Sequence, residues 1–168
     1  MKILIAYFSH MGNTEELARK IQEITGGDLV EIVPKRPYPT DYRSIVSQAE
    51  REKREDFRPE IEETGVDVRE YDAIFIGTPV WWFSAAPPTK TFLSQNDLSG
   101  KTVVPFCTHG GGGVADTFNE IARMAPRSEV KKGLETYENS ATEEEIAEWI
   151  SRLWQRSGES QKAIQTRQ

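Results

Sequence analysis

Apolar residues gather in five short runs along the chain, and amphipathic segments separate these runs. The runs predict β-strands at Lys2–Tyr7, Leu29–Val33, Ala73–Gly77, Thr102–Cys107 and Glu129–Thr136. The first, third and fourth runs are almost continuously apolar, as strands covered on both faces require. The fifth run contains the mixed stretch KKGL and better suits the edge of a sheet.

The segments between the strands have helical periodicity or helix-capping signals. In the first of them, Leu17, Ala18, Ile21 and Ile24 form one apolar face before a pair of glycines ends the pattern. Helices are therefore predicted over 14–25, over 41–55 with Thr40 as N-cap, over 88–94, over 114–124, and over 146–154 after the capping box Thr142–Glu145.

Strand and helix thus alternate five times along the chain. This alternation predicts an α/β fold, with a doubly wound, five-stranded parallel sheet in a three-layer sandwich. The strand order 2-1-3-4-5 is the leading candidate. We expect residues 1–155 to form one domain and residues 156–168 to form a polar C-terminal tail.

Composition narrows the classes of function. The chain of 168 residues has a formal net charge of −6 and lacks the basic footprint of a nucleic-acid-binding protein. Its single cysteine, Cys107, cannot form an intramolecular disulfide. The apolar N-terminus is too short for a membrane span and lacks the cleavage site of a signal peptide. We therefore expect a cytoplasmic protein that binds neither nucleic acid nor membrane.

Three unusual loops follow the first, third and fourth strands: SHMGNT at 9–14, TPVWWFS at 78–84 and THGGGG at 108–113. The order 2-1-3-4-5 places these strands side by side. The loops then meet at the carboxyl edge of the sheet, where open α/β sheets bind their ligands. The motifs HExxH, CxxC, G-x-S-x-G and the nucleotide-binding glycine motifs are missing, so we expect no metal site and no hydrolase.

The first loop carries neutral polar groups at the start of a helix. Ser9, Asn13 and Thr14 offer hydroxyl or amide donors, and Gly12 permits close approach of the backbone. The free amides of the helix favour an anion at the same place. The loop therefore suits a phosphate group, although Asn13 or Thr14 could instead be a simple helix cap.

The other two loops suit a flat ligand. Trp81, Trp82 and Phe83 cannot all point into the core, so at least one faces a pocket or water and could stack on a planar ring. The glycine run either lets backbone amides approach such a ring or is a flexible turn. His109 could bond a ligand edge or be a solvated loop residue. Cys107 is expected to pack rather than to react.

Together, the stretches YFSHMGNT, GTPVWWFSAAPPTKTFL and VVPFCTHGGGG resemble those of the flavodoxin-like FMN proteins, over Met1 to about Trp154. They are most similar to the short branch of flavodoxins and flavin reductases. The resemblance implies the flavodoxin-like fold with FMN as cofactor. It implies contacts to the phosphate from Ser9, His10, Met11, Gly12, Asn13 and Thr14, to the ring and ribityl chain from Thr78, Pro79, Val80, Trp81, Trp82 and Phe83, and to the pyrimidine edge from Thr108, His109, Gly110, Gly111 and Gly113.

The implied function is that of an FMN-binding redox protein, in electron transfer or as a small FMN-dependent oxidoreductase. Its partners would be a redox protein, NAD(P)H or a small-molecule acceptor. An NAD(P)H-linked quinone or nitro reductase is an alternative, and a flavin-free module that docks a protein through the WWF loop is another. Tyr38 and Tyr42 could overhang the pocket or only pack the second helix. That charged helix does not resemble a dimer seam, so a monomer is favoured over a dimer.

Overall fold

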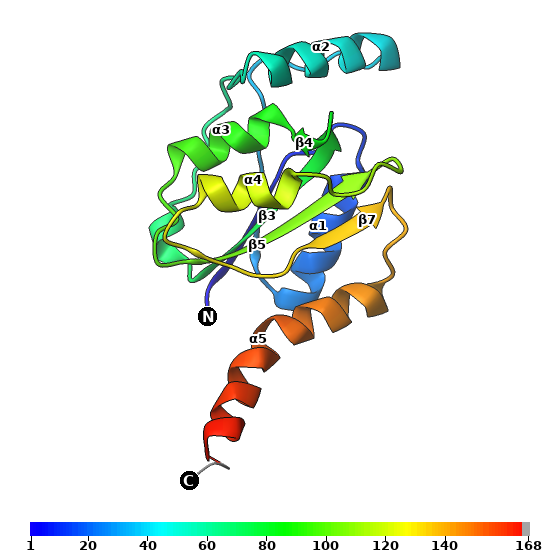
Figure 1. Cartoon of the computed structure of the whole chain (residues 1–168). Helices are drawn as coiled ribbons and strands as arrows, with labels where there is room; N and C mark the ends of the chain where they lie inside the picture. The colour runs from blue at the N-terminus through cyan, green and yellow to red at the C-terminus, as the bar shows by residue number, and fades with distance from the viewer. Residues whose placement is uncertain (166–168) are drawn as a thin grey trace.

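The computed structural model describes residues 1–165, and their side chains as far as Gln155. Its strands form one sheet (Figure 1). The order of the strands along the sheet is β2-β1-β3-β5-β6. This order confirms the predicted α/β fold with strand order 2-1-3-4-5. The parallel strands are β1 (Ile3–Tyr7), β2 (Asp28–Glu31), β3 (Ala73–Trp81), β5 (Thr102–His109), β6 (Glu129–Val130) and β7 (Leu134–Tyr137).

Four helices cover the two faces of the sheet. Along β3, Ile74 and Ile76 belong to the core cluster of one face, whereas Phe75 belongs to the cluster of the other face. Alternate residues of one strand thus fill both cores, which explains the continuous apolar runs and confirms the three-layer sandwich. The helices are α1 (Asn13–Thr25) and α5 (Glu143–Gln165) on one face, and α3 (Pro87–Gln95) and α4 (Thr117–Met124) on the other (Figure 1).

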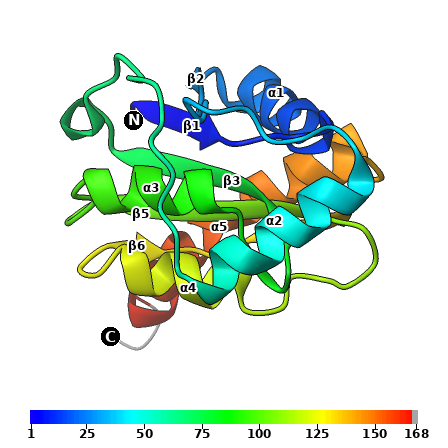
Figure 2. The same ribbon diagram turned by 90° about the horizontal axis from the view of Figure 1, so that it is seen from above.

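A fifth helix, α2 (Tyr42–Arg54), lies outside both layers and crosses the carboxyl ends of the strands (Figure 2). Asp41 caps this helix, because its carboxylate accepts the amide of Ser44 at 2.9 Å. The prediction that Thr40 is the cap was wrong, since the extended residue next to the first helical turn is Asp41. The chain then returns to β3 through a 3₁₀ helix, η1 (Val68–Glu70).

One predicted helix begins later than expected, and the predicted C-terminal tail lies partly outside the described residues. The helix predicted to begin at 114 begins at Thr117, because Ala115 has a φ of +49°, which a right-handed helix does not accommodate. The predicted tail, 156–168, continues α5 as far as Gln165, but its side chains and residues 166–168 lie outside the described part of the chain. Within residues 1–165, no helix combines the length and apolar character that a membrane span needs.

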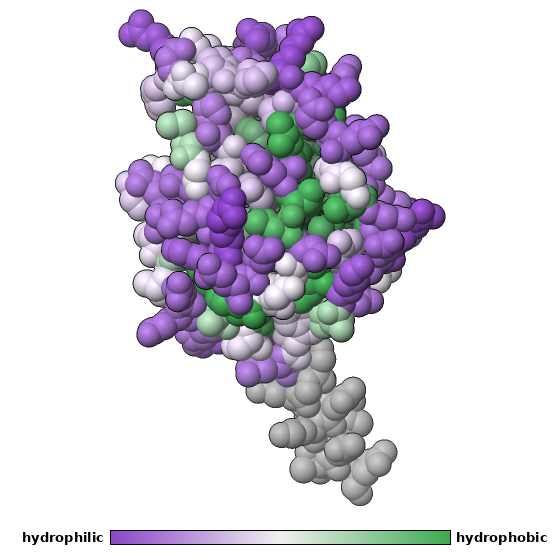
Figure 3. Space-filling model, turned by 180° about the vertical axis from the view of Figure 1, so that it is seen from behind, coloured by the Kyte–Doolittle hydropathy of each residue, from purple (hydrophilic) through white to green (hydrophobic). Residues whose placement is uncertain are grey.

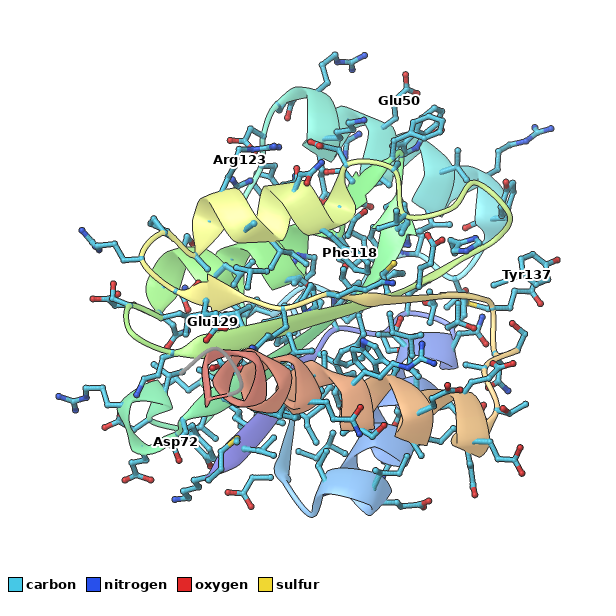
Figure 4. All side chains as sticks on the ribbon, turned by 60° about the horizontal axis from the view of Figure 1, so that its bottom comes forward. Glu50, Asp72, Phe118, Arg123, Glu129 and Tyr137 are labelled. Carbon is cyan, nitrogen blue, oxygen red and sulfur yellow. The ribbon has the colours of Figure 1, made fainter. Side chains whose placement is uncertain are left out.

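A bulge splits the predicted fifth strand, 129–136, into β6 and β7. Both pieces pair with β5, but the pairing resumes one residue out of step after a break that lies opposite Val104 and Pro105. Proline has no amide hydrogen to give to the ladder. In the bulge, a Cβ on Gly133 would lie 2.6 Å from the ring of Phe118, which extends from α4 toward the strands (Figure 4). Only glycine therefore fits where the strand breaks.

A shielded ion pair anchors β4 (Ser84–Ala85), a short strand that runs antiparallel to β3. Glu120 of α4 accepts Lys90 Nζ of α3 at 2.8 Å, the Ser84 hydroxyl at 2.9 Å and the Ala85 amide at 2.8 Å. The side chains of Lys90 and Glu120 are 7% and 19% exposed. Removing one partner of such a pair leaves the other charge buried without compensation.

Replacing Glu120 by Gln is expected to lower the free energy of unfolding by roughly 3–5 kcal/mol, because Lys90 then stays buried without a counter-charge. Urea unfolding followed by circular dichroism measures this change. The matched control is Asp116→Asn at the start of α4. Asp116 pairs with Arg123 at the surface, where both side chains are more than half exposed, so the control should unfold like the parent. Equal unfolding curves for the two variants would show that the ion pair does not anchor β4.

Candidate functional site

The carboxyl ends of β1, β3 and β5 open into a pocket of about 620 Å³. Helix α2, which crosses these strand ends (Figure 2), contributes part of its lining. The three unusual loops line this pocket, so the structure brings together residues that are far apart in the sequence. The predicted site residues that line it are Ser9, His10, Met11, Asn13, Thr14, Pro79, Val80, Trp81, Trp82, Phe83, Thr108, His109, Gly110 and Gly113.

Three predicted site residues, Gly12, Thr78 and Gly111, are not among the lining residues of the pocket. Thr78 is fully buried, and its hydroxyl accepts the amide of Ala86 at 2.9 Å, which fastens β3 to the start of α3. Gly12 precedes the first turn of α1. The amide of Gly111 donates to His109 Nδ1 at 3.0 Å and so turns into the loop. These residues shape the loops from behind the pocket.

One wall of the pocket comes from α2, which the motifs did not include. Tyr42, Ile45, Val46 and Ala49 line the pocket, and their spacing places them on one face of the helix. Of the two alternatives for the tyrosines, Tyr42 lines the pocket, whereas Tyr38 is buried and packs the second helix, since its hydroxyl donates to Glu52 of α2 at 2.6 Å. Helix α2 lies at the top of the molecule (Figure 1). In the view from behind, hydrophobic side chains gather beneath this top region (Figure 3).

Two residues of the pocket lining, next to the start of α1, carry polar atoms that are buried without partners. Ser9 Oγ and His10 Nε2 find no hydrogen-bond partner among the described residues. Both precede α1, and none of the described side chains caps the first turn of this helix. Glu15 and Glu16 of that turn pair with cations one helical turn further on. Buried polar atoms without partners are costly, so this part of the pocket suits an anionic ligand.

A hydroxyl–hydroxyl bond ties the first loop to the third. Gly12 occupies the N-cap position of α1 with a φ of +98°, so Asn13 and Thr14 are not caps. Instead, the Thr14 hydroxyl bonds the Thr108 hydroxyl at 2.8 Å, and both side chains are buried. The start of α1 and the end of β5 are therefore held in register with each other.

The second loop is part of a β-hairpin. β3 continues to Trp81 and turns back into β4 through Trp82 and Phe83, whose φ angles are +50° and +62°. Two positive φ angles match the type I′ hairpin turn, which normally uses Asn and Gly. Other residues pay about 1–2 kcal/mol each for this conformation. The turn is therefore strained unless its surroundings hold it.

Contacts from α2 hold the strained turn. Trp82 Nε1 donates to the carbonyl of Val46 at 2.9 Å. Lys53 Nζ donates to the carbonyl of Trp82, and it lies 5.5 Å from the centroid of the Phe83 ring. A cation over an aromatic face contributes about 0.5–1 kcal/mol at exposed sites. The turn and the helix that roofs the pocket therefore stabilise each other.

The three consecutive aromatics have different surroundings. Trp81 packs edge-on against Phe8, His10 and Tyr38, with ring centroids 5.4, 5.7 and 5.0 Å away. Phe83, by contrast, is 58% exposed. The expectation that the three rings cannot all point inward is therefore correct. Trp81 is the packed ring of this aromatic wall, and the residues of the turn form its exposed side.

The pocket has little charge. Among the described residues, no lysine or arginine lines it, Glu138 is its one carboxylate, and Gly112 adds a further backbone position. Burial, with a smaller contribution from Glu135, raises the pKa of the Cys107 thiol to about 12. This thiol is protonated at neutral pH, in agreement with the expected packing role.

A family model described as flavodoxin matches residues 2–153. The chain belongs to the flavodoxin family. It is 35% identical to a candidate flavoprotein from Bacteroides eggerthii DSM 20697, over 90% of this chain and 97% of that one, with a TM-score of 0.81. It is 29% identical to a flavoprotein from Lactobacillus acidophilus NCFM, solved in complex with FMN, over 83% and 94% of the two chains, with a TM-score of 0.68.

Oxidised flavodoxin 2 from Bacillus cereus shares the fold at 21% identity, over 93% of this chain and 99% of that one, with a TM-score of 0.61. The resemblance that the three loops predicted is therefore confirmed at the level of the family. In the present chain, α2 and the strained hairpin enclose the pocket together.

Replacing Trp82 by Phe removes the bond to Val46 and keeps an aromatic ring. We expect the amides of α2 to exchange with solvent about two- to tenfold faster, since one hydrogen bond contributes about 0.5–1.5 kcal/mol. Hydrogen exchange read by mass spectrometry measures this. The control is Trp149→Phe, which deletes a bond of the same kind to Lys132, outside α2. If α2 exchanges equally in both variants, Trp82 does not hold the helix.

Proposed function

We propose that this protein is an FMN-dependent redox protein, and that it acts as a small oxidoreductase. FMN is the cofactor of the flavodoxin family, and the pocket suits its two ends. Ser9 Oγ, His10 Nε2 and the first amides of α1 would hold the phosphate. The wall of Trp81 and the turn after it would cover the flat ring. Bound FMN would supply electron transfer, and the protein would position and tune it.

One observation carries this proposal. Ser9 Oγ and His10 Nε2 are buried without partners in the same pocket whose other walls are aromatic and apolar. An anion site and a flat apolar slot in one cavity match a ligand that has a phosphate at one end and a planar ring at the other.

The roof of the pocket supports an oxidoreductase of small molecules over an electron carrier. Ile45, Val46 and Ala49 of α2 face the pocket with apolar side chains, which suits a small, flat, uncharged acceptor and limits the approach of a protein. The electron carrier is the second candidate. Exposed Met11, Tyr42 and Phe83 favour it, because they present apolar atoms that a partner protein could contact.

Two alternatives have less support. An NAD(P)H-linked reductase needs a place for nucleotide phosphates, and no lysine or arginine among the described residues lines the pocket. The phosphates of a nucleotide donor would therefore bind outside the residues that line the pocket. A flavin-free docking module needs a free WWF loop, whereas Trp82 is bonded to α2.

The setting of the protein is also a proposal. The single cysteine is buried, which fits the reducing cytoplasm. The last turn of α2 carries Arg51, Lys53 and Arg54, and this charge favours a monomer over a dimer that pairs through α2.

An anaerobic flavin titration tests the function. We expect the purified protein to bind added FMN, to be reduced by dithionite, and to be reoxidised rapidly by a small quinone or nitroaromatic compound. Fast bleaching of the visible flavin band by NADPH or NADH would instead favour the nucleotide-linked reductase. Reoxidation only by a partner protein would favour the carrier. Failure to bind FMN at all would overturn the proposal.

Replacing Ser9 by Ala is expected to weaken FMN binding about five- to tenfold, because one donor to the phosphate is lost. Riboflavin lacks the phosphate, so its affinity should not change. Fluorescence quenching titrations with both flavins measure the two affinities. The control is Ser151→Ala, an exposed serine on α5 whose hydroxyl bonds its own helix. Equal losses of affinity for FMN and riboflavin would place Ser9 away from the phosphate.

A further inference from the structure

The histidine at the end of β5 turns its ring back onto the glycine loop. His109 Nδ1 accepts the amide of Gly111 at 3.0 Å and the amide of Gly113 at 3.2 Å. Both glycines have positive φ angles, +121° and +74°, which other residues adopt only under strain. The loop is therefore a defined structure with two hydrogen bonds, rather than the flexible turn that four consecutive glycines could form.

These two bonds fix the protonation state of the ring. A nitrogen that accepts two N–H groups carries no proton of its own, so His109 is neutral and its proton resides on Nε2. Protonation of Nδ1 would set three N–H groups against one another and break both bonds. Each of these bonds thus requires the neutral imidazole.

The same bonds orient the amides of the glycine loop. The amides of Gly111 and Gly113 turn inward to His109, and Gly111 is absent from the pocket lining. The next amide, that of Val114, is also taken, by Glu135 Oε2 at 2.8 Å. Gly110, Gly112 and Gly113 line the pocket. The two bonds to one ring nitrogen therefore fix the course of the backbone that the loop presents to the pocket.

We propose that neutral His109 is the positioning residue that shapes the glycine loop for the cofactor, and that protonation of His109 releases the loop and weakens cofactor binding in mild acid. The effect on the cofactor rests on the proposed function, whereas the effect on the loop does not. His109 acts through Gly110, Gly112 and Gly113 of the loop, which line the pocket.

Several ionisable groups lie in the surroundings of His109. On β7, Glu135 bonds the Val114 amide, and the Tyr137 ring lies 6.1 Å from the His109 ring. Glu138, just after β7, donates its amide to the His109 carbonyl at 2.7 Å and lines the pocket. From the first loop, His10 also lines the pocket. Histidine side chains change charge within about pH 5–8, so the test compares pH 8 with pH 5.5.

Three proteins test the loop without any cofactor: the parent, His109→Asn and His109→Phe. Asparagine places a non-titrating acceptor as many bonds from the backbone as Nδ1, and it can accept the amide two residues on. Phenylalanine keeps a ring without an acceptor. The readout is solvent exchange of the Gly111 and Gly113 amide protons by NMR, corrected for the intrinsic effect of pH.

In the parent, we expect both amides to be protected at pH 8 and to lose at least about fivefold of that protection at pH 5.5. His109→Asn should keep the protection at both pH values, and His109→Phe should lose it at both. Protection that is the same in His109→Phe and in the parent would overturn the proposal, because the ring nitrogen would then not hold the loop.

Flavin affinity tests the second half of the proposal. We expect His109→Phe to bind riboflavin about tenfold more weakly than the parent at pH 8, and His109→Asn to stay within about threefold. Parent affinity should fall between pH 8 and pH 5.5, whereas that of His109→Asn should not. Riboflavin is used because it has no phosphate that titrates in this range. A parent affinity that does not depend on pH would overturn the switch.

The two readouts separate the possible failures. If the parent binds no flavin but its amides follow the expected pattern, the proposed function fails and the role of His109 in the loop stands. If flavin binds and the amides do not respond to His109, the proposed function stands and the inference fails.

Discussion

Burial of both faces of a parallel sheet is the constraint on which the site depends. Helices α1 and α5 cover one face, and α3 and α4 cover the other, so β1, β3 and β5 run side by side in one direction. Their carboxyl ends open at one edge, and the loops that follow them must meet there. The fold thus assembles hydroxyls, free amides and flat rings in one pocket, and it does so through apolar contacts that lie far from the chemistry.

The hairpin between β3 and β4 shows what such a site demands of the rest of the chain. Its aromatic turn has an unfavourable backbone conformation, which persists only where neighbours over-determine it. Glu120 fixes the β4 side from the helix layer, and Lys53 fixes the turn from α2. The Lys90–Glu120 ion pair and the contacts from α2 therefore both hold the aromatic turn in a backbone conformation that glycine would adopt more easily.

Apolar periodicity was sufficient to predict the sheet, its order and the meeting of the loops, because these follow from which residues avoid water. Apolar periodicity was insufficient for local features that depend on a single contact. The split of the fifth strand depends on Pro105 and on the fit of Gly133 against Phe118. The hairpin lacks the Asn or Gly that normally marks it. Glu120 resembles any surface carboxylate of a helix, and periodicity shows that α2 has an apolar face without showing that the face roofs a pocket.

An anion site built without a cation places a particular demand on rigidity. A lysine or arginine attracts a phosphate over several ångströms, whereas hydroxyl and amide donors act only at hydrogen-bond distance and in the correct direction. Ser9, His10 and the start of α1 must therefore be in place before a ligand arrives. The buried bond between Thr14 and Thr108 meets this demand, since it fixes the start of α1 to the end of β5. It also links the anion site of the pocket to the glycine loop, so a change in the shape of one loop strains the other.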